Sequence, residues 1–473
     1  MAALTQNIFL VLCLTLLLTI FSPCKSSIIS INPNNGQPPL LLYLPVRKDA
    51  DTLQYVTVIQ QRTPPVPLNL TLDLGGRQLW VDCDQPYISS TYSPARCGSP
   101  HCSLVADSRS CFNDCFFQSQ PGCHNDTCGL VVDNSVAGIV TGGEVGMDVI
   151  YVEAPAAMRG ISGMEMVSVP EFLFTCGASF LLEGLADGVS GMAGLGRTKM
   201  SFPSQFSAAI SGGMGKTFSL CLGPTTGAVL FAPPAGYSDV ANSLVFAPLL
   251  TNPVSTATCH NDSEASSEYF VGVKSIKVNG TPVKVNATLL SIDEQGRGGT
   301  KISTVDPYTV LERSIYDAVL NAFVVEASGK YNMTRISSVG PFGACFNASG
   351  IRITRYGPAV PTIEVEFENG VAAWRILGAN SMVRVGDEVT CLGLVDGGAN
   401  PRTAVVIGGH QLEDNLVVFD AERSRVGLSG SMLGRGRSCA GFVDRITTFG
   451  SYNGSGFDSL ILGPVNKIGP FFS

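Results

Sequence analysis

The sequence lacks any cluster of lysine and arginine residues, and only 14% of its 473 residues are charged. Its formal net charge is −8 at pH 7. Domains that bind nucleic acid usually carry a basic patch or stripe. We therefore expect no nucleic-acid partner.

The chain also lacks a long apolar run near its N-terminus. Residues 8–21 form an apolar run of 14 residues that ends at Ser22-Pro23-Cys24. A membrane-spanning helix needs about 20 such residues. A short run followed by small residues is typical of a secretory signal peptide, although no Lys or Arg precedes it here. We predict a signal peptide at 1–26, secretion, and no membrane attachment after cleavage.

Eight Asn-x-Ser/Thr motifs support secretion, because they are acceptors for N-glycosylation. Asn69 lies in a predicted strand, so we do not expect a glycan there. The predicted glycosylation sites are Asn125, Asn261, Asn279, Asn286, Asn332 and Asn347.

Cleavage of the signal peptide removes Cys13 and Cys24 and leaves 13 of the 15 cysteines. Cys259 lies in a loop rich in Ser and Thr, and we predict that its thiol is unpaired. The remaining twelve predict six disulfides of unspecified pairing. These are Cys83, Cys97, Cys102, Cys111, Cys115, Cys123, Cys128, Cys176, Cys221, Cys345, Cys391 and Cys439.

Metal binding is the alternative for residues 97–128, where Cys-x4-Cys and Cys-x3-Cys spacings recur. His101 and His124 are the only nearby histidines, and a secreted protein folds in an oxidising compartment. We therefore expect neither a metal nor a cofactor.

The fold class is predicted to be mostly β. The chain has 52 Gly and 28 Pro, and short runs rich in Val, Ile, Leu and Thr alternate with turn signals. Helical spacing appears at 312–328. We predict one lobe at 27–221, a Gly/Pro-rich crossover at 222–245, a second lobe at 246–445 and a disordered tail at 446–473.

Asp73 lies between two apolar runs and is followed by Leu74-Gly75-Gly76. This arrangement resembles the Asp-Thr-Gly loop of pepsin-like aspartic proteases, with Leu74 in place of Thr. Such enzymes use two aspartates, one from each lobe, that share a proton.

The matching loop of the second half reads Ser303-Thr304-Val305, with Ser303 at the position of the second aspartate. A serine hydroxyl does not titrate near neutral pH. Asp306 follows three residues later. Along an extended strand it would lie about 10 Å away and on the opposite face. The hairpin expected to cover the cleft, residues 131–140, lacks a tyrosine. We therefore predict no protease activity, with Asp73 and Ser303 as remnants and Asp73 in a structural role.

Four segments together resemble the plant extracellular dermal glycoprotein family, which includes xyloglucan-specific endoglucanase inhibitors and is related to cereal xylanase inhibitors and legume basic globulins. The segments are 73–85, 191–197, 299–311 and 405–415. The resemblance implies a bilobal, disulfide-rich pepsin-like fold that is catalytically inactive. It also implies a role in plant defence in the apoplast or cell wall, as an inhibitor of microbial glycoside hydrolases. Xyloglucan-specific endo-β-1,4-glucanase is the first expected target and xylanase the next.

Related inhibitors insert basic residues from loops of the second lobe into the enzyme groove, where a retaining glycosidase holds two carboxylates about 5–5.5 Å apart. Arg402, in a Gly/Pro turn, and Arg335 are the matching candidates here. A glycan on Asn332 would crowd Arg335.

Two other functions stay open. The protein is an active aspartic endopeptidase if an unrecognised residue acts as the catalytic partner of Asp73. It is a storage or ligand-binding protein, like the legume globulins, if neither arginine is needed. We expect the protein to be a monomer.

Overall fold

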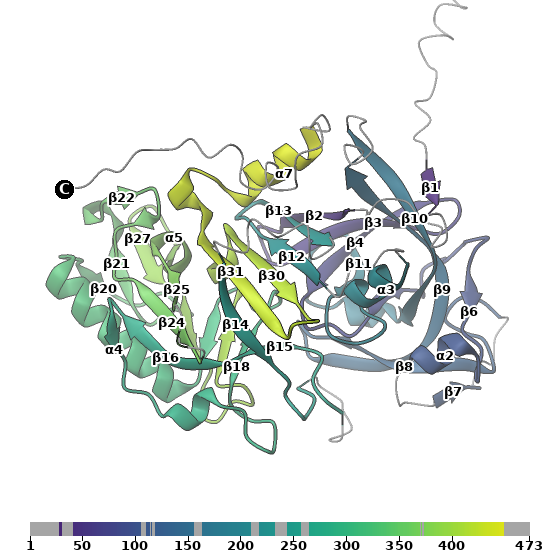
Figure 1. Cartoon of the computed structure of the whole chain (residues 1–473), viewed down its shortest axis with the longest axis horizontal. Coiled ribbons are helices and arrows are strands. Elements are labelled where there is room, and N and C mark those ends of the chain that lie inside the picture. Colours follow the sequence, from purple (N-terminus) through teal and green to yellow (C-terminus); the bar gives the residue numbers. More distant parts are fainter. Residues whose placement is uncertain are drawn as a thin grey trace, which may run out of the picture.

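The computed structural model describes residues 28–30, 41–105, 110–113, 115, 119–155, 163–209, 217–231, 244–256, 264–368, 370 and 373–448. The predicted signal peptide, Cys259 and Asn261 lie outside the described residues. Two lobes rich in strands lie side by side (Figure 1), which confirms the mostly β, bilobal prediction.

In the residues that the structure describes, the first lobe contains strands and three short helical segments. The strands are β1 (Ile28–Ser30), β2 (Leu42–Lys48), β3 (Tyr55–Gln61), β4 (Val66–Asp73), β5 (Leu79–Asp82), β6 (Ser93–Pro94), β7 (Ser110–Phe112), β8 (Thr127–Asn134), β9 (Ile139–Pro155), β10 (Met164–Gly177), β11 (Val189–Gly194), β12 (Thr217–Cys221) and β13 (Thr226–Phe231). The helical segments are α2 (Pro100–Leu104), η2 (Ser179–Leu182) and α3 (Phe202–Ala209).

The second lobe has shorter strands and the longest helix of the described chain. The strands are β14 (Val245–Leu250), β15 (Tyr269–Val271), β16 (Val273–Val278), β17 (Thr281–Pro282), β18 (Thr300–Ile302), β19 (Thr309–Leu311), β20 (Arg335–Ile336), β21 (Cys345–Asn347), β22 (Ile353–Thr354), β23 (Gly357–Pro358), β24 (Ile363–Phe367), β25 (Ala373–Ile376), β26 (Met382–Arg384), β27 (Val389–Leu392), β28 (Leu394–Asp396), β29 (Val405–Ile407), β30 (Asn415–Asp420) and β31 (Arg425–Ser431). The helical segments are η5 (Ala287–Leu290), α4 (Arg313–Lys330), η6 (Ala348–Gly350), α5 (Gly378–Ser381), α6 (Gly409–Leu412), η7 (Met432–Arg435) and α7 (Cys439–Thr448).

The helix predicted at 312–328 is α4. Glu312 caps it, because its carboxylate accepts hydrogen bonds from the backbone N–H groups of Ser314 and Ile315 at 2.8 and 3.3 Å. The side chains of Ile315, Val319 and Phe323 recur at helical spacing and are buried against the second lobe.

The same strand arrangement occurs once in each lobe. In the first, β4 runs parallel to β11 and β5 parallel to β10, while β5 and β11 are antiparallel. In the second, β18 runs parallel to β29 and β19 parallel to β28, while β19 and β29 are antiparallel. This confirms the internal repeat expected of a pepsin-like chain. It also places Asp73 at the end of β4 and Ser303 directly after β18.

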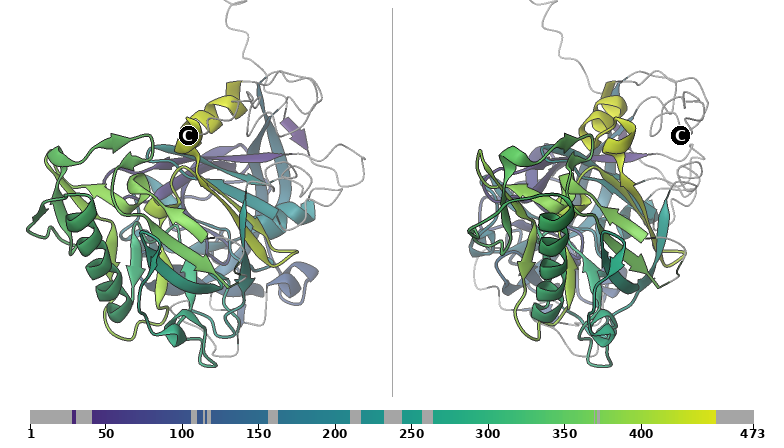
Figure 2. Two further views of the ribbon diagram at one scale, coloured as in Figure 1. Left: turned by 60° about the vertical axis from the view of Figure 1, so that its left-hand side comes forward. Right: turned by 90° about the vertical axis from the view of Figure 1, so that its left-hand side faces the viewer.

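A sheet shared by both lobes joins them. Its order is β2-β13-β12-β30-β31-β14, and the pairing of β12 with β30 crosses from one lobe to the other. The predicted crossover at 222–245 thus includes β13. Helix α7 contacts β13, beside this sheet (Figure 2), and extends three residues into the predicted tail. The tail beyond residue 448 lies outside the described residues.

All twelve cysteines predicted to form disulfides do so. The pairs are Cys83–Cys176, Cys97–Cys111, Cys102–Cys128, Cys115–Cys123, Cys221–Cys439 and Cys345–Cys391. Within the described residues, no group of three or more His, Cys, Asp or Glu side chains could hold a metal ion. No described helix is both long enough and apolar enough to cross a bilayer.

Candidate functional site

Asp73 lies at the floor of the cleft between the lobes. Its side chain is buried, and its Oδ1 accepts a hydrogen bond from the backbone N–H of Gly75 at 2.9 Å. A Cβ at Gly76 would lie only 2.8 Å from the Cα of Gly194, so the turn after Asp73 requires glycine there. The turn thus holds the Asp73 carboxyl group at the lining of the cavity between the lobes.

A hairpin of the first lobe closes over Asp73. Strands β8 and β9 form this hairpin, and at its turn the Oγ of Ser135 donates a hydrogen bond to Asp73 Oδ2 at 2.5 Å. Residues 131–140, in which the sequence lacks a tyrosine, form the turn end of this hairpin. Sequence reasoning missed the role of Ser135, because 62 residues separate it from Asp73.

The pKa of Asp73 is raised from 3.8 to about 6. Burial is the main cause, because it disfavours the charged form. The hydrogen bond from Ser135 opposes the increase, and the negative charges of Asp133 and Glu268 add to it. Asp73 thus keeps a proton at a pH where an exposed aspartate has lost it.

Ser303 lies in the matching loop of the second lobe and faces the same cavity as Asp73. Its Oγ accepts hydrogen bonds from the backbone N–H groups of Val305 and Asp306 at 3.2 and 3.1 Å. The next residue links the two loops, since Thr304 Oγ1 donates to the Leu72 carbonyl at 2.7 Å and accepts from the Leu74 N–H at 2.9 Å. Leu74, which stands in place of the Thr of an Asp-Thr-Gly loop, has no hydroxyl and so cannot form the equivalent side-chain hydrogen bonds to the second-lobe loop.

The prediction that Asp306 points away from the cleft was wrong. Strand β18 ends at Ile302, and the chain then turns, so that Asp306 lines the same cavity as Asp73 and Ser303. The alternation of side chains holds only while a strand stays extended. Asp73 therefore shares its cavity with an aspartate of the second lobe, as well as with Asp133 of the first, although Asp306 is not at the position of Ser303.

The cavity has a volume of about 130 Å³ and a polar lining. Lys301 lines it and forms an ion pair with Glu268 at 2.6 Å. Burial alone would lower the pKa of Lys301, but the negative charges of Glu268, Asp306 and Asp73 raise it. A fixed cation thus stands among the carboxylates of this cavity.

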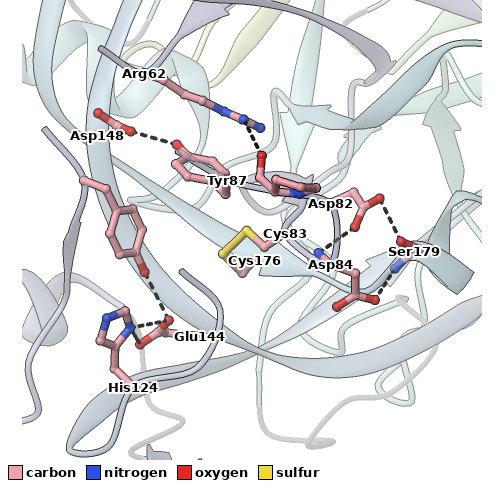
Figure 3. The surroundings of a disulfide bond; sticks show 12 residues. Arg62, Asp82, Cys83, Asp84, Tyr87, His124, Glu144, Asp148, Cys176 and Ser179 are labelled. Atoms are coloured by element: carbon pink, nitrogen blue, oxygen red, sulfur yellow. Dashed lines mark hydrogen bonds and ion pairs between the residues drawn. A yellow bond between two sulfur atoms is a disulfide. The ribbon is translucent and has the colours of Figure 1, made fainter. Parts of the chain in front are cut away.

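A disulfide ties down the end of β5, the strand that follows the Asp73 loop (Figure 3). Cys83 follows β5 and is bonded to Cys176 near the end of β10. On either side of Cys83, Asp82 accepts a hydrogen bond from the Ser179 hydroxyl at 2.9 Å, and Asp84 accepts one from the Ser179 N–H at 2.8 Å. These contacts fix β5, which leaves the Asp73 turn.

Asp73→Asn is expected to change how stability depends on pH. Because the folded pKa lies above the unfolded value, the contribution of Asp73 to stability is full below pH 3.8 and is lost as the pH rises through about 6. This difference between the folded and unfolded pKa values of Asp73 corresponds to about 3 kcal/mol. The carboxamide of the variant cannot titrate, so the variant should gain up to about 3 kcal/mol on the wild type as the pH rises from about 4 to about 7. Urea denaturation at both pH values measures this gain, and an unchanged difference between the two proteins would contradict it.

Arg402 lies in the loop between β28 and β29. Its side chain is exposed and forms no ion pair within the described part of the chain. The loop itself is held firmly. The Arg402 carbonyl accepts from the Gly298 N–H at 2.8 Å, Asp396 accepts from the Gly398 N–H at 2.8 Å, and Arg313 pairs with Asp396 at 2.9 Å. A free guanidinium thus stands on a fixed loop.

The contact with Gly298 brings a second exposed arginine close to Arg402. Arg297 precedes Gly298 in a turn whose conformation is fixed by two hydrogen bonds, from its own N–H to Asp293 Oδ1 at 2.8 Å and from Asn252 Nδ2 to the Gly296 carbonyl at 2.9 Å. Sequence reasoning did not single out Arg297. Only the pairing of two loops far apart in the chain reveals it.

Arg335 begins β20 and is also exposed, but its Nη2 donates a hydrogen bond to the Gly343 carbonyl at 3.2 Å. The pKa of Tyr316 is raised mainly by burial, and both Asp396 and Arg335 act on it electrostatically. Arg335 and Asp396, which lies at the start of the Arg402 loop, are thus both within electrostatic range of Tyr316.

The Arg402 loop and the cleft are separate sites. Arg402 precedes β29, whereas Ser303 follows β18, and the two strands run parallel. The arginine loop thus lies at the opposite end of these strands from the cavity.

The predicted glycosylation sites differ in exposure. Asn125, Asn286 and Asn332 are exposed, whereas Asn279 and Asn347 are half-buried. Asn279 Nδ2 donates to Glu326 Oε2 at 2.7 Å. Asn69, where no glycan is expected, donates from Nδ2 to the Gly188 carbonyl at 3.1 Å. Occupancy at all of these sites remains a prediction.

Comparison with known proteins matches both lobes. Residues 55–231 match the family described as xylanase inhibitor N-terminal, and residues 268–430 match xylanase inhibitor C-terminal. The chain is 53% identical over 414 residues to "Probable aspartic proteinase GIP2" of Nicotiana benthamiana, and the match covers 85% of this chain and 92% of the relative.

Solved structures agree with this assignment. The crystal structure of edgp is 50% identical, has a TM-score of 0.80, and covers 86% of this chain and 99% of its own. The soybean basic 7S globulin is 37% identical, has a TM-score of 0.71, and covers 85% and 99% of the two chains. The chain therefore belongs to the xylanase-inhibitor family of pepsin-like, two-lobed proteins, together with edgp and the basic 7S globulins.

Proposed function

We propose that this protein is a secreted inhibitor of microbial cell-wall glycoside hydrolases and that xyloglucan-specific endo-β-1,4-glucanase is its first target. The exposed guanidinium of Arg402 on a fixed loop is the observation that carries this proposal. Guanidinium groups pair with carboxylates through two parallel hydrogen bonds and stay charged at every relevant pH. The catalytic carboxylates of a glycosidase groove are matching partners.

The rigidity of the loop favours binding. A loop that is already ordered loses little conformational freedom when it enters a groove, so more of the interaction energy remains as affinity. Arg297 adds a second positive charge beside Arg402, which favours the approach to an acidic groove. Arg335 contributes less, because its guanidinium already donates to Gly343. The protein acts as a monomer in the apoplast or cell wall.

The test is inhibition of a purified microbial xyloglucan-specific endoglucanase by the secreted, glycosylated protein, with a xylanase assayed beside it. Inhibition of the endoglucanase supports the proposed target. Inhibition of the xylanase alone would shift the target within the same class. Inhibition of neither enzyme would leave the globulin-like storage or ligand-binding function as the better candidate.

Aspartic endopeptidase activity is the second candidate, because Asp306 lines the same cavity as Asp73. We propose that the protein nevertheless lacks this activity. Ser303 cannot share the proton of an aspartate pair, Ser135 donates a hydrogen bond to Asp73, and the ion pair of Lys301 with Glu268 lines the cavity.

We expect no cleavage of a denatured protein substrate between about pH 3 and 6, the range in which aspartic proteases work through their shared proton. The assay compares the wild type with Asp73→Asn and with Asp306→Asn, each with and without a statine-type inhibitor. Cleavage that the inhibitor blocks and that either substitution abolishes would overturn the proposed inactivity.

A further inference from the structure

A small hairpin of the second lobe carries an unusual set of exposed side chains. Strands β22 and β23 form this hairpin around a turn at Arg355 and Tyr356. Figure 1 shows β22 at the outer edge of the second lobe. Ile353 and Tyr356 are 72% and 38% exposed, and the side chain of Arg352 is also exposed.

The hairpin turn is docked on η7. Arg355 Nη1 donates a hydrogen bond to the Gly434 carbonyl at 3.1 Å. The Tyr356 ring packs so closely on Gly434 that a Cβ there would lie 2.3 Å from a ring atom. The next residue, Arg435, is exposed. Residues from two distant parts of the chain thus meet in one surface, the "hairpin patch" of Arg352, Ile353, Arg355, Tyr356 and Arg435.

The turn is also internally fixed. Thr354 Oγ1 donates to the Gly357 carbonyl at 2.9 Å and accepts from the Tyr356 N–H at 3.1 Å. Gly357 has a φ of 85°, in the left-handed region that favours glycine. The patch therefore presents its side chains from a rigid frame.

The hairpin patch carries uncompensated positive charge. None of Arg352, Arg355 and Arg435 forms an ion pair with any residue in the described ranges. Other exposed cations of this lobe do have acidic neighbours: Lys274 pairs with Glu366 at 3.6 Å and Arg375 with Glu364 at 3.2 Å. On a chain with a net charge of −8, three exposed arginines without an ion pair in the described ranges thus lie around one exposed tyrosine.

We propose that the hairpin patch binds an acidic polysaccharide, a chain of sugars that carry carboxylates. The guanidinium groups of Arg352 and Arg435 can each pair with a sugar carboxylate, and planar Arg groups suit this geometry better than Lys. The exposed parts of Tyr356 and Ile353 offer apolar surface to the C–H faces of the sugar rings. The patch therefore supplies both contacts that a charged sugar needs.

The size of the patch favours a polymer over a protein partner. A stable protein interface buries about 800 Å² on each side, from roughly 20 to 30 residues. Five side chains on one hairpin offer much less. A repeating polyanion can bind through only a few arginines of the protein, because many equivalent binding positions lie along the polymer. This proposal is independent of the inhibitory function. It uses only the proposed secretion, which would bring the protein to such polymers.

The test measures binding of the full-length secreted protein to polygalacturonate and, as a matched polymer, to fully methyl-esterified polygalacturonate. We expect binding to the acidic polymer that weakens with added salt, and none to the esterified polymer. Arg352→Gln/Arg435→Gln should weaken binding about tenfold or more, whereas Arg384→Gln, an exposed arginine that pairs with Asp387, should not.

Equal binding of both polymers, unchanged binding of the double variant, or no binding by the wild type would each overturn the proposal. The melting temperature of the double variant, which should match that of the wild type, excludes loss of fold as the cause. Endoglucanase inhibition separates the two proposals, because the double variant should inhibit as the wild type does. A double variant that loses polymer binding and retains inhibition is the expected result.

Discussion

Arg402→Ala is expected to weaken inhibition of a sensitive endoglucanase by about thirty- to several-thousand-fold. Truncating one partner of a buried, hydrogen-bonded charge pair costs about 2–5 kcal/mol, which corresponds to this range in the inhibition constant. Much of the loss comes from the enzyme carboxylate, which would be buried without a partner. Because the loop is held by backbone contacts of Gly298 and by Asp396, the substitution should leave the fold unchanged.

Two further variants give this prediction its controls. Arg384→Ala removes an exposed arginine of the same lobe that pairs with Asp387 and should inhibit as the wild type does. Arg335→Ala should lose less than Arg402→Ala, since the Arg335 guanidinium already donates to the Gly343 carbonyl. If the Arg402→Ala and Arg335→Ala variants both inhibit as strongly as the wild type, neither arginine enters the enzyme groove.

Glu413→Gln is expected to lower the free energy of unfolding by about 3–5 kcal/mol, the cost of breaking a buried ion pair. Glu413 follows α6 of the second lobe, and its carboxylate accepts hydrogen bonds from Lys48 Nζ at 2.6 Å and from Tyr55 Oη at 2.9 Å, both in the first lobe. His410 Nδ1 lies 3.3 Å away. Burial alone would raise the pKa of Glu413, but His410 and Lys48 lower it, so the group is an anion at neutral pH.

The substitution leaves Lys48 as a partly buried cation without its partner, at the junction of the two lobes. Urea denaturation at neutral pH measures the loss, and a lower midpoint with an unchanged slope would show that stability alone has changed. Asp387→Asn is the matched control, because Asp387 is fully exposed and its contact with Arg384 is screened by water. Equal midpoints for Glu413→Gln and the wild type would show that this cluster does not join the lobes.

Much of the architecture could be predicted from local sequence. The strand and glycine turn at Asp73, the serine at position 303, the twelve cysteines and the apolar face of α4 all depend on residues close together in the chain or on composition. A period of 3.6 identifies a helix, and a family motif identifies a loop, without knowledge of the rest of the fold.

The contacts that complete the candidate sites could not be predicted in this way. Ser135 reaches Asp73 across 62 residues, and Arg297 lies beside Arg402 only because Gly298 donates to a carbonyl of another loop. Asp306 was misplaced because the end of β18 was not anticipated, and the alternation of side chains stops where a strand stops. Side chains from distant loops meet through tertiary structure, and no periodic pattern encodes that meeting.

Inhibition of a microbial xyloglucan-specific endoglucanase by the purified, glycosylated protein, measured beside its Arg402→Ala variant, tests the central proposal most directly. We predict strong inhibition by the wild type and a loss of at least about thirtyfold in the variant, or about 2 kcal/mol. If the wild type inhibits neither this enzyme nor a xylanase, the proposed function is contradicted.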